Sequence, residues 1–254
     1  MTEASHQRLT IDQFTRQAVP FTKLPGHSTS LELLAELSQL KGTDEVLDVA
    51  CGPGIVACYF AENAQRVTGV DLTPEMLRQA RRRQEEQGLK NLEWVEGSGE
   101  RLPFPDDRFS LVVSRYAFHH FERPETVLAE MCRVCQPGGI VLVADVCLPA
   151  EQVAAYDALE KLRDPSHVHV LSRDEICTLF ENQKLQQIQF GEYKVELTVE
   201  EQLAASFPVP GGAEEFRRLL ENDVTENRFG VSAHQEAGVL SYAVPIVAAA
   251  GRKS

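Results

Sequence analysis

Residues 46–60, VLDVACGPGIVACYF, are the stretch that decides the fold. The apolar residues of 45–50 predict a buried strand, and the pattern of 55–63 predicts a helix. Between the two, Gly52 and Gly54 flank a proline. Glycines at such a turn permit unusual backbone angles and let a ligand approach the main chain closely. The stretch therefore predicts a ligand-binding turn at the carboxyl end of a first strand.

The rest of the first 150 residues alternates between strand and helix patterns. Thr73 and Pro74 open one of the helices and Gly88 ends it, while Ser28 or Ser30 caps the first helix. Strands that are apolar throughout and alternate with helices indicate a parallel sheet covered on both faces. We expect strands over 66–71, 91–97, 109–115, 140–146, 185–197 and 238–253, and helices over 28–40, 73–88, 124–134 and 172–183.

The length of 254 residues suits one α/β domain. Within 1–254 we expect an N-terminal cap segment over 1–40 and a ligand-binding core over 41–150. The polar segment 200–235 is either a lid or a surface excursion.

Composition restricts the class of partner. Acids outnumber bases 38 to 25, a net charge of −13, which disfavours nucleic acid. No apolar run is long enough for a membrane span, and the polar N-terminus does not resemble a signal peptide. Six scattered cysteines indicate a reducing, cytoplasmic setting rather than a disulfide framework.

The glycine turn alone leaves the ligand open. GPGIVA fits a dinucleotide fingerprint, and Asp71 stands near the spacing of a ribose-binding acid. Asp48, on the strand before the turn, would repel a pyrophosphate but suits a ligand that carries an amino group. This favours S-adenosylmethionine over a nicotinamide or flavin.

Four segments carry a resemblance to a known family: VLDVACGPG, VTGVDLTPEMLRQAR, GSGERLPFPDDRFSLVVSRYAFHHF and VLAEMCRVCQPGGIVLVADV. Over roughly 45–146 the chain resembles the class I S-adenosylmethionine-dependent methyltransferases, and within them the ubiquinone and menaquinone biosynthesis C-methyltransferases. The resemblance implies a Rossmann-like sheet of seven strands in the order 3-2-1-4-5-7-6, with the seventh strand antiparallel and helices on both faces.

The resemblance also implies the cofactor contacts. It gives the methionine end to Asp48, Ala50, Cys51, Gly52 and Gly54, the ribose to Asp71, and the adenine to Leu72, Met76, Ser98, Gly99 and Glu100. Many relatives have an aspartate where Ser98 stands, and a hydroxyl makes a weaker hydrogen bond than a carboxylate. The alternatives are solvated strand ends or helix caps for the acids and core packing for Met76.

Candidate catalytic residues follow the fourth strand, in SRYAFHHF. His119 or His120 could act as a general base, although a packing or capping role is the alternative. Arg115 could hold the cofactor or an anionic acceptor, or make a surface ion pair. The segment 14–28, with Phe21 and His27, is expected to fold over the cofactor. No arrangement of acids and asparagine indicates a metal, so we expect metal-independent catalysis.

The sequence thus predicts an S-adenosylmethionine-dependent methyltransferase that acts on carbon or oxygen of a small, partly apolar molecule. A cofactor-binding regulatory or partner subunit without turnover is the alternative, and a NAD-dependent oxidoreductase is a minor one. Neither the acceptor nor the oligomeric state follows from the sequence.

Overall fold

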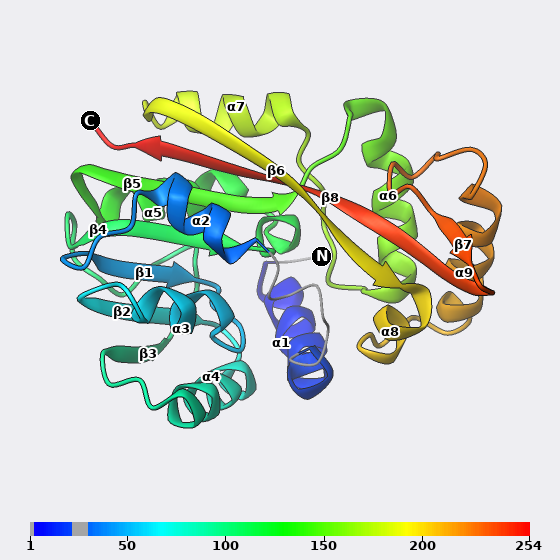
Figure 1. Cartoon of the computed structure of the whole chain (residues 1–254), viewed down its shortest axis with the longest axis horizontal. Coiled ribbons are helices and arrows are strands. Elements are labelled where there is room, and N and C mark those ends of the chain that lie inside the picture. The colour runs from blue at the N-terminus through cyan, green and yellow to red at the C-terminus, as the bar shows by residue number, and fades with distance from the viewer. Residues whose placement is uncertain (1–2, 22–29) are drawn as a thin grey trace.

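The fold is an α/β sandwich built on one central sheet (Figure 1), seen in a computed structural model that describes residues 3–21 and 30–254. The helices are α1 (Glu3–Phe21), α2 (Leu31–Ser38), α3 (Ile55–Ala61), α4 (Pro74–Gln87), α5 (Pro124–Val134), α6 (Ala150–Arg163), α7 (Arg173–Asn182), α8 (Val199–Ala204) and α9 (Gly212–Asp223), with a 3-10 turn, η2 (Phe118–His120). The strands are β1 (Glu45–Val49), β2 (Arg66–Asp71), β3 (Leu92–Glu96), β4 (Phe109–Arg115), β5 (Cys135–Val146), β6 (Gln186–Thr198), β7 (His234–Glu236) and β8 (Val239–Arg252).

The strand order is β3-β2-β1-β4-β5-β8-β6, and β7 pairs with β8 outside this row. β1 to β5 are parallel, whereas β8 runs antiparallel to β5, β6 and β7. The predicted α/β class and order are therefore confirmed, with β8 in the place of the seventh strand. The predicted count of seven is wrong by one, because β7 adds a short hairpin partner to β8. Its two-residue turn has positive φ at Ala237 and Gly238, as a tight hairpin requires.

Successive side chains of the central strands point to opposite faces of the sheet. Val46 of β1 packs with α2 and α3, whereas Leu47 packs with α5 and α7. Leu111 and Val112 of β4 divide in the same way. Because both faces are covered, these strands are apolar throughout, which is the pattern that the sequence shows.

β6 and β8 form a long two-stranded ribbon that extends beyond the rest of the sheet (Figure 1). Its outer half carries a separate apolar cluster with α6 and α9, including Tyr156, Phe216 and Tyr242. The segment 200–235 belongs to this region and contains α9 and most of α8.

Several local expectations need correction. α1 and α6 were not predicted, and β5 begins at Cys135 rather than at residue 140. The first helix of the core begins only at Leu31; Ser30 stands at its N-cap with a left-handed backbone, and its side chain makes no capping bond. Ser28 lies outside the described residues. All six cysteines are free.

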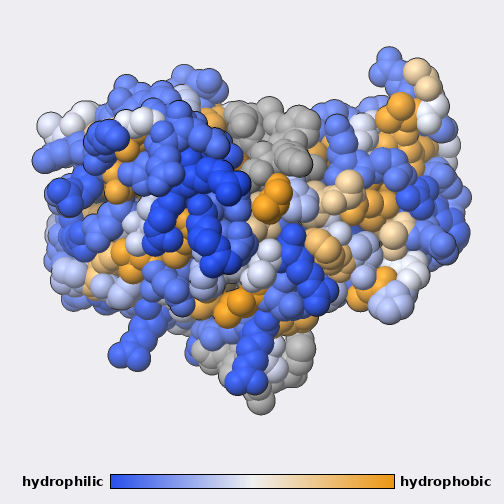
Figure 2. Space-filling view, turned by 90° about the horizontal axis from the view of Figure 1, so that it is seen from below, coloured by the Kyte–Doolittle hydropathy of each residue, from blue (hydrophilic) through white to orange (hydrophobic). Residues whose placement is uncertain are grey.

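The face shown in Figure 2 is mostly hydrophilic, with hydrophobic residues in patches near its middle and over its right-hand part. Within residues 3–21 and 30–254, no helix combines the length and the apolar character needed to cross a membrane.

Candidate active site

The turn after β1 has the backbone that its glycines predict. Ala50, Gly52 and Gly54 all have positive φ, of 54°, 51° and 75°. The amide of Cys51 donates to the carbonyl of Val70, 3.0 Å away, which ties the turn to β2. The turn thus lies at the carboxyl edge of the parallel strands, where ligands bind in folds of this kind.

The two glycines serve different purposes. A Cβ on Gly52 would meet no atom within 4 Å, so this residue faces open space in the cavity. A Cβ on Gly54 would lie 2.6 Å from Cη2 of Trp94 and 3.0 Å from Cβ of Ala80. Gly54 does not line the cavity. It is needed for packing between the turn, α4 and β3, and its expected contact with the methionine end of the cofactor stays a prediction.

Asp71, the last residue of β2, is hydrogen-bonded to the glycine turn and to the start of α4. Its Oδ2 accepts from the amide of Gly52 at 2.8 Å, and its Oδ1 accepts from the amide of Thr73 at 2.8 Å. Each carboxylate oxygen can accept a further hydrogen bond. Burial raises the pKa of Asp71, although the two amides oppose this effect. The side chain is therefore a fixed acceptor at the end of β2.

Asp48 is a second buried acid, only 2% exposed. Its Oδ2 accepts from the amide of Ala57 at 3.0 Å. Burial raises the pKa of Asp48 to about 7, although the positive charge of Arg115 opposes this effect. A cation bound beside Asp48 would relieve that penalty, because an opposite charge favours the ionised carboxylate.

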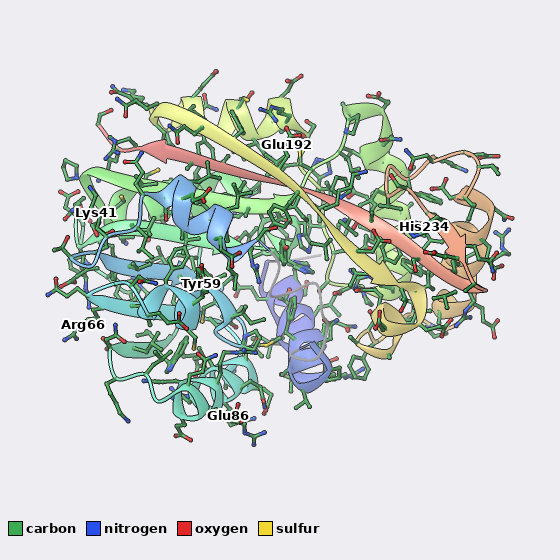
Figure 3. All side chains as sticks on the ribbon, viewed as in Figure 1. Lys41, Tyr59, Arg66, Glu86, Glu192 and His234 are labelled. Atoms are coloured by element: carbon green, nitrogen blue, oxygen red, sulfur yellow. The ribbon has the colours of Figure 1, made fainter. Side chains whose placement is uncertain are left out.

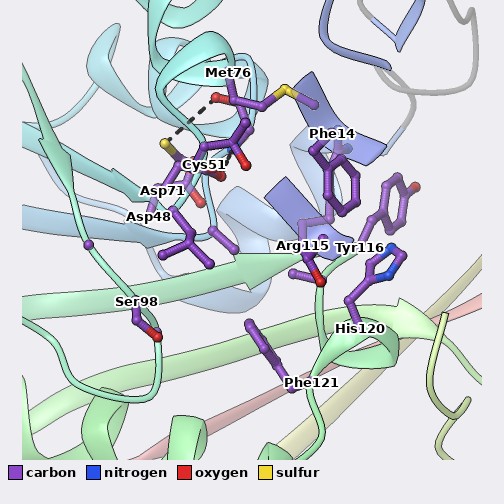
Figure 4. Close-up of a pocket in the computed structure, with 18 of the residues that line it drawn as sticks. Phe14, Asp48, Cys51, Asp71, Met76, Ser98, Arg115, Tyr116, His120 and Phe121 are labelled. Atoms are coloured by element: carbon purple, nitrogen blue, oxygen red, sulfur yellow. Dashed lines mark hydrogen bonds between the residues drawn. The ribbon is translucent and has the colours of Figure 1, made fainter. Parts of the chain in front are cut away.

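These residues line an open cavity, with Asp48, Cys51 and Asp71 on one side and Phe14, Tyr116 and His120 on the other (Figure 4). The cavity brings together every predicted cofactor residue except Gly54: Asp48, Ala50, Cys51, Gly52, Asp71, Leu72, Met76, Ser98, Gly99, Glu100 and Arg115. Met76 is also buried in the core, at 2% exposure.

The loop after β3 is held by its own hydrogen bonds. The hydroxyl of Ser98 accepts from the amide of Glu100 at 3.2 Å, and the Glu100 carboxylate accepts from Arg123 at 3.1 Å. Gly99 fits tightly, because a Cβ there would lie 3.2 Å from Val49. The loop is thus a preformed edge of the cavity.

One wall comes from α1, which sequence analysis missed as a helix. His6, Gln7, Thr10 and Phe14 line the cavity. The ring of His6 is tied by Nε2 to the carbonyl oxygen of His120, 2.9 Å away. The side chain of Phe21 and all of His27 lie outside the described residues.

A second cavity adjoins the first. Phe14, Tyr116 and His120 line both cavities. Tyr116 has a φ of 56°, a conformation that is uncommon for an aromatic residue and that concentrates at functional sites. Its hydroxyl is 3.0 Å from that of Tyr193, and its ring packs under Arg115. Tyr116 is thus held between the two cavities.

His119 lines only the second cavity. Its Nδ1 is 2.6 Å from Oδ1 of Asp145, a buried residue at the end of β5. Burial would lower the pKa of His119, but the charge of Asp145 and the hydrogen bond to it outweigh burial and raise it. Among the described residues, no group bonds to Nε2 of His119. This carboxylate–histidine pair has the arrangement of a general base.

His120 has a different character. Its Nδ1 is 3.1 Å from the carbonyl oxygen of Ser166, so Nδ1 carries the hydrogen. Burial and the neighbouring His119 lower the pKa of His120 to about 3. His120 is therefore neutral at physiological pH and is a much weaker base than His119.

The family described as "Methyltransferase domain" matches residues 47–143. A solved structure of a Bacillus halodurans protein, described as a candidate methyltransferase, superposes with a TM-score of 0.81 at 30% identity, covering 89% of this chain and 99% of the other. The chain belongs to the class I S-adenosylmethionine-dependent methyltransferases. This confirms the family, the fold class and the cofactor predicted from the sequence.

The curated relatives of this methyltransferase are matched over part of their length. The uncharacterized methyltransferase YcgJ of Bacillus subtilis is 34% identical over 64% of this chain and 65% of its own. The ubiquinone/menaquinone biosynthesis C-methyltransferase UbiE of Pseudomonas putida is 32% identical over 48% of this chain and 50% of its own. This chain thus spans less than two thirds of either relative.

The fold is also shared more widely. The [4+2]-cyclase SpnF superposes with a TM-score of 0.62 at 20% identity, over 89% of this chain and 81% of that one. Likeness at that level concerns the fold alone, so the reaction has to be argued from the site.

The residues present fit S-adenosylmethionine. Gly52 leaves open space beside the turn, Asp71 offers two carboxylate oxygens, and Asp48 would be stabilised by a cation. A ligand in which an amino acid is joined to a ribose would fill the open space, bond to Asp71 through the ribose and place its ammonium group beside Asp48. Among the described residues, no three acidic, histidine or cysteine side chains form a metal-binding group. Metal independence remains a prediction.

Proposed function

We propose that this methyltransferase moves the methyl group of S-adenosylmethionine to oxygen or carbon of a small, partly apolar acceptor. The observation that carries the proposal is the pair of adjoining cavities, with Phe14, Tyr116 and His120 in the wall that they share. The first cavity holds the donor, and the second, which carries the His119–Asp145 pair, receives the acceptor.

Asp71 accepts hydrogen bonds from the ribose hydroxyls, and Asp48 pairs with the amino group of the methionine part. When bound, the cofactor supplies a methyl group on a positively charged sulfur, already activated for transfer. The remaining work of the chain is to align the acceptor and to exclude water. The electron pair of the broken carbon–sulfur bond stays on sulfur, and the new bond forms to the acceptor atom.

His119 takes the proton that the acceptor loses, through Nε2. Asp145 fixes the ring by its bond to Nδ1 and stabilises the imidazolium that forms. His120 orients the acceptor through its unprotonated Nε2. Arg115, beside Asp48 and over Tyr116, positions the methionine end of the donor rather than the acceptor.

Isothermal calorimetry with S-adenosylmethionine and with NAD tests the cofactor, and we expect binding of the first only. Release of S-adenosylhomocysteine, measured with labelled cofactor and metabolite extracts as the acceptor source, tests turnover. Cofactor binding without release from any extract would favour a regulatory or partner subunit. Binding of NAD in place of S-adenosylmethionine would end the proposal.

A further inference from the structure

The second cavity has an apolar floor that extends well beyond the histidines. The floor is the outer half of the β6–β8 ribbon, where Val195 pairs with Val244 and Leu197 pairs with Tyr242. At its near end Ile246 pairs with Val146, the residue after Asp145. Tyr242 lies four residues farther along β8, about 13 Å away at the rise of a β-strand. The cavity is therefore a slot that is longer than a single ring.

α6 forms the facing wall. Tyr156, Glu160 and Arg163 line the slot, and their spacing places them on one face of the helix. Tyr156 and Tyr242 are 3% and 1% exposed. Within the described part of the chain, neither phenolic hydroxyl has a hydrogen-bond partner. Neither hydroxyl is one of the fully enclosed polar atoms that lack a partner, so both open into the slot and can bond to a ligand there.

The charged side chains that line the slot do not favour binding of an anion. Arg163 is paired with the carboxylate of Glu160 and donates to the hydroxyl of Ser206 at 3.2 Å. Asp164 also lines the slot, nearer to His120, and interactions with His120 and Arg163 lower its pKa although burial opposes this. The two carboxylates outweigh the single guanidinium, so a carboxylate or phosphate on the acceptor would be repelled.

We propose that the slot binds the methyl acceptor, and that this acceptor is an elongated, uncharged molecule with an oxygen function at each end. The methyl-accepting end lies at His119, the apolar body lies along the ribbon, and a hydroxyl or carbonyl oxygen at the far end accepts from Tyr242. Tyr156 offers a second donor between them. The inference rests on the proposed function and specifies its substrate class.

Three phenols of equal length test the class: para-hexylphenol, the same phenol with a hydroxyl in place of the last methyl group, and the same phenol ending in a carboxylate. Each is titrated calorimetrically into protein saturated with S-adenosylhomocysteine, so that binding is measured without turnover. We expect the hydroxyl-ended phenol to bind at least tenfold more tightly than the carboxylate.

Tyr242→Phe should weaken binding of the hydroxyl-ended phenol about three- to tenfold, the range for one neutral hydrogen bond, and change para-hexylphenol less than twofold. Tyr156→Phe is the second variant and should weaken the hydroxyl-ended phenol as well. Tyr59→Phe is the matched control, because Tyr59 lies on α3 outside both cavities (Figure 3). Thermal unfolding checks that each variant is folded.

Three outcomes would overturn the acceptor class: equal binding of the carboxylate, an unchanged affinity in both tyrosine variants, or no binding of any phenol to protein that binds S-adenosylhomocysteine. A protein that does not bind S-adenosylhomocysteine would overturn the proposed function and the acceptor class with it.

Discussion

Asp48→Asn should make the unliganded protein more stable at neutral pH while it weakens cofactor binding. The pKa of Asp48 is raised from its ordinary value of 3.8 to about 7 by burial. Between these values the folded protein holds a proton that the unfolded chain has lost. The free energy of unfolding therefore falls as pH rises from about 4 to about 7, and the whole penalty acts above pH 7.

A shift from 3.8 to about 7 corresponds to about 4 kcal/mol. Asparagine removes the charge, and its side-chain oxygen can still accept from the amide of Ala57. The new amide must itself be buried, so we expect a net gain of about 1–3 kcal/mol at pH 8. For a chain of this size, such a gain raises the melting temperature by about 2–4 °C per kcal/mol.

Urea or thermal unfolding of the unliganded protein at pH 8 and pH 5 measures the effect. The gain should be large at pH 8 and small at pH 5, where the wild-type carboxyl is already protonated. Asp145→Asn is the control of opposite sign. Burial raises the pKa of Asp145, but the charge of His119 and the hydrogen bonds from His119 and Val146 together outweigh burial and lower it, so that variant should lose stability at pH 8. An Asp48→Asn protein that is less stable at pH 8, or equally stabilised at both pH values, would refute the reasoning.

Three further changes have defined outcomes. Asp71→Ala should weaken S-adenosylmethionine binding about a hundredfold by calorimetry, since two hydrogen bonds to a charged group are lost, and an unchanged affinity would contradict the ribose contact. His119→Gln should lower kcat about 100- to 10,000-fold and remove the rise of kcat with pH through the raised pKa of His119, whereas His234→Gln on the exposed hairpin should change neither; equal turnover in both variants would remove His119 from the mechanism. Gly54→Ala should cost about 2–4 kcal/mol in urea unfolding, because its φ is 75° and the new Cβ would clash with Trp94, and a neutral result would show that the turn can move.

The sequence predicts the centre of the fold well and its periphery poorly. Strands β1, β2 and β4 and helix α5 match their predicted ranges within a residue. These elements bury apolar side chains, so the hydrophobic periodicity of the sequence predicts them directly. The glycine turn and Asp71 were found for the same reason, because both are tied to a buried strand end.

α1 and α6 were missed because they bury polar residues. α6 buries Asp157, which is paired with His167 from outside the helix, and Glu160, which is paired with Arg163 at the end of the same helix. α1 likewise buries Gln17, which donates to Asp164 from 147 residues away. The partners of Asp157 and Gln17 are known only once the chain is folded, and the buried polar residues interrupt the apolar pattern of both helices.

The second cavity could not be predicted for a related reason. His119 was identified as a candidate base, but its partner Asp145 belongs to a strand that the sequence marks only as apolar. The requirement for glycine at position 54 depends on where Trp94 lies in the next strand but one. Both features depend on the register between strands and not on local pattern.

β6 and β8 pack into different apolar clusters at their two ends. Their inner halves complete the central sheet, and their outer halves form the floor of the second cavity, where we propose that the acceptor binds. Substitutions in the outer halves can therefore change which molecule is methylated without rebuilding the donor site. Evolution, or a protein engineer, can vary acceptor choice here while donor chemistry stays constant.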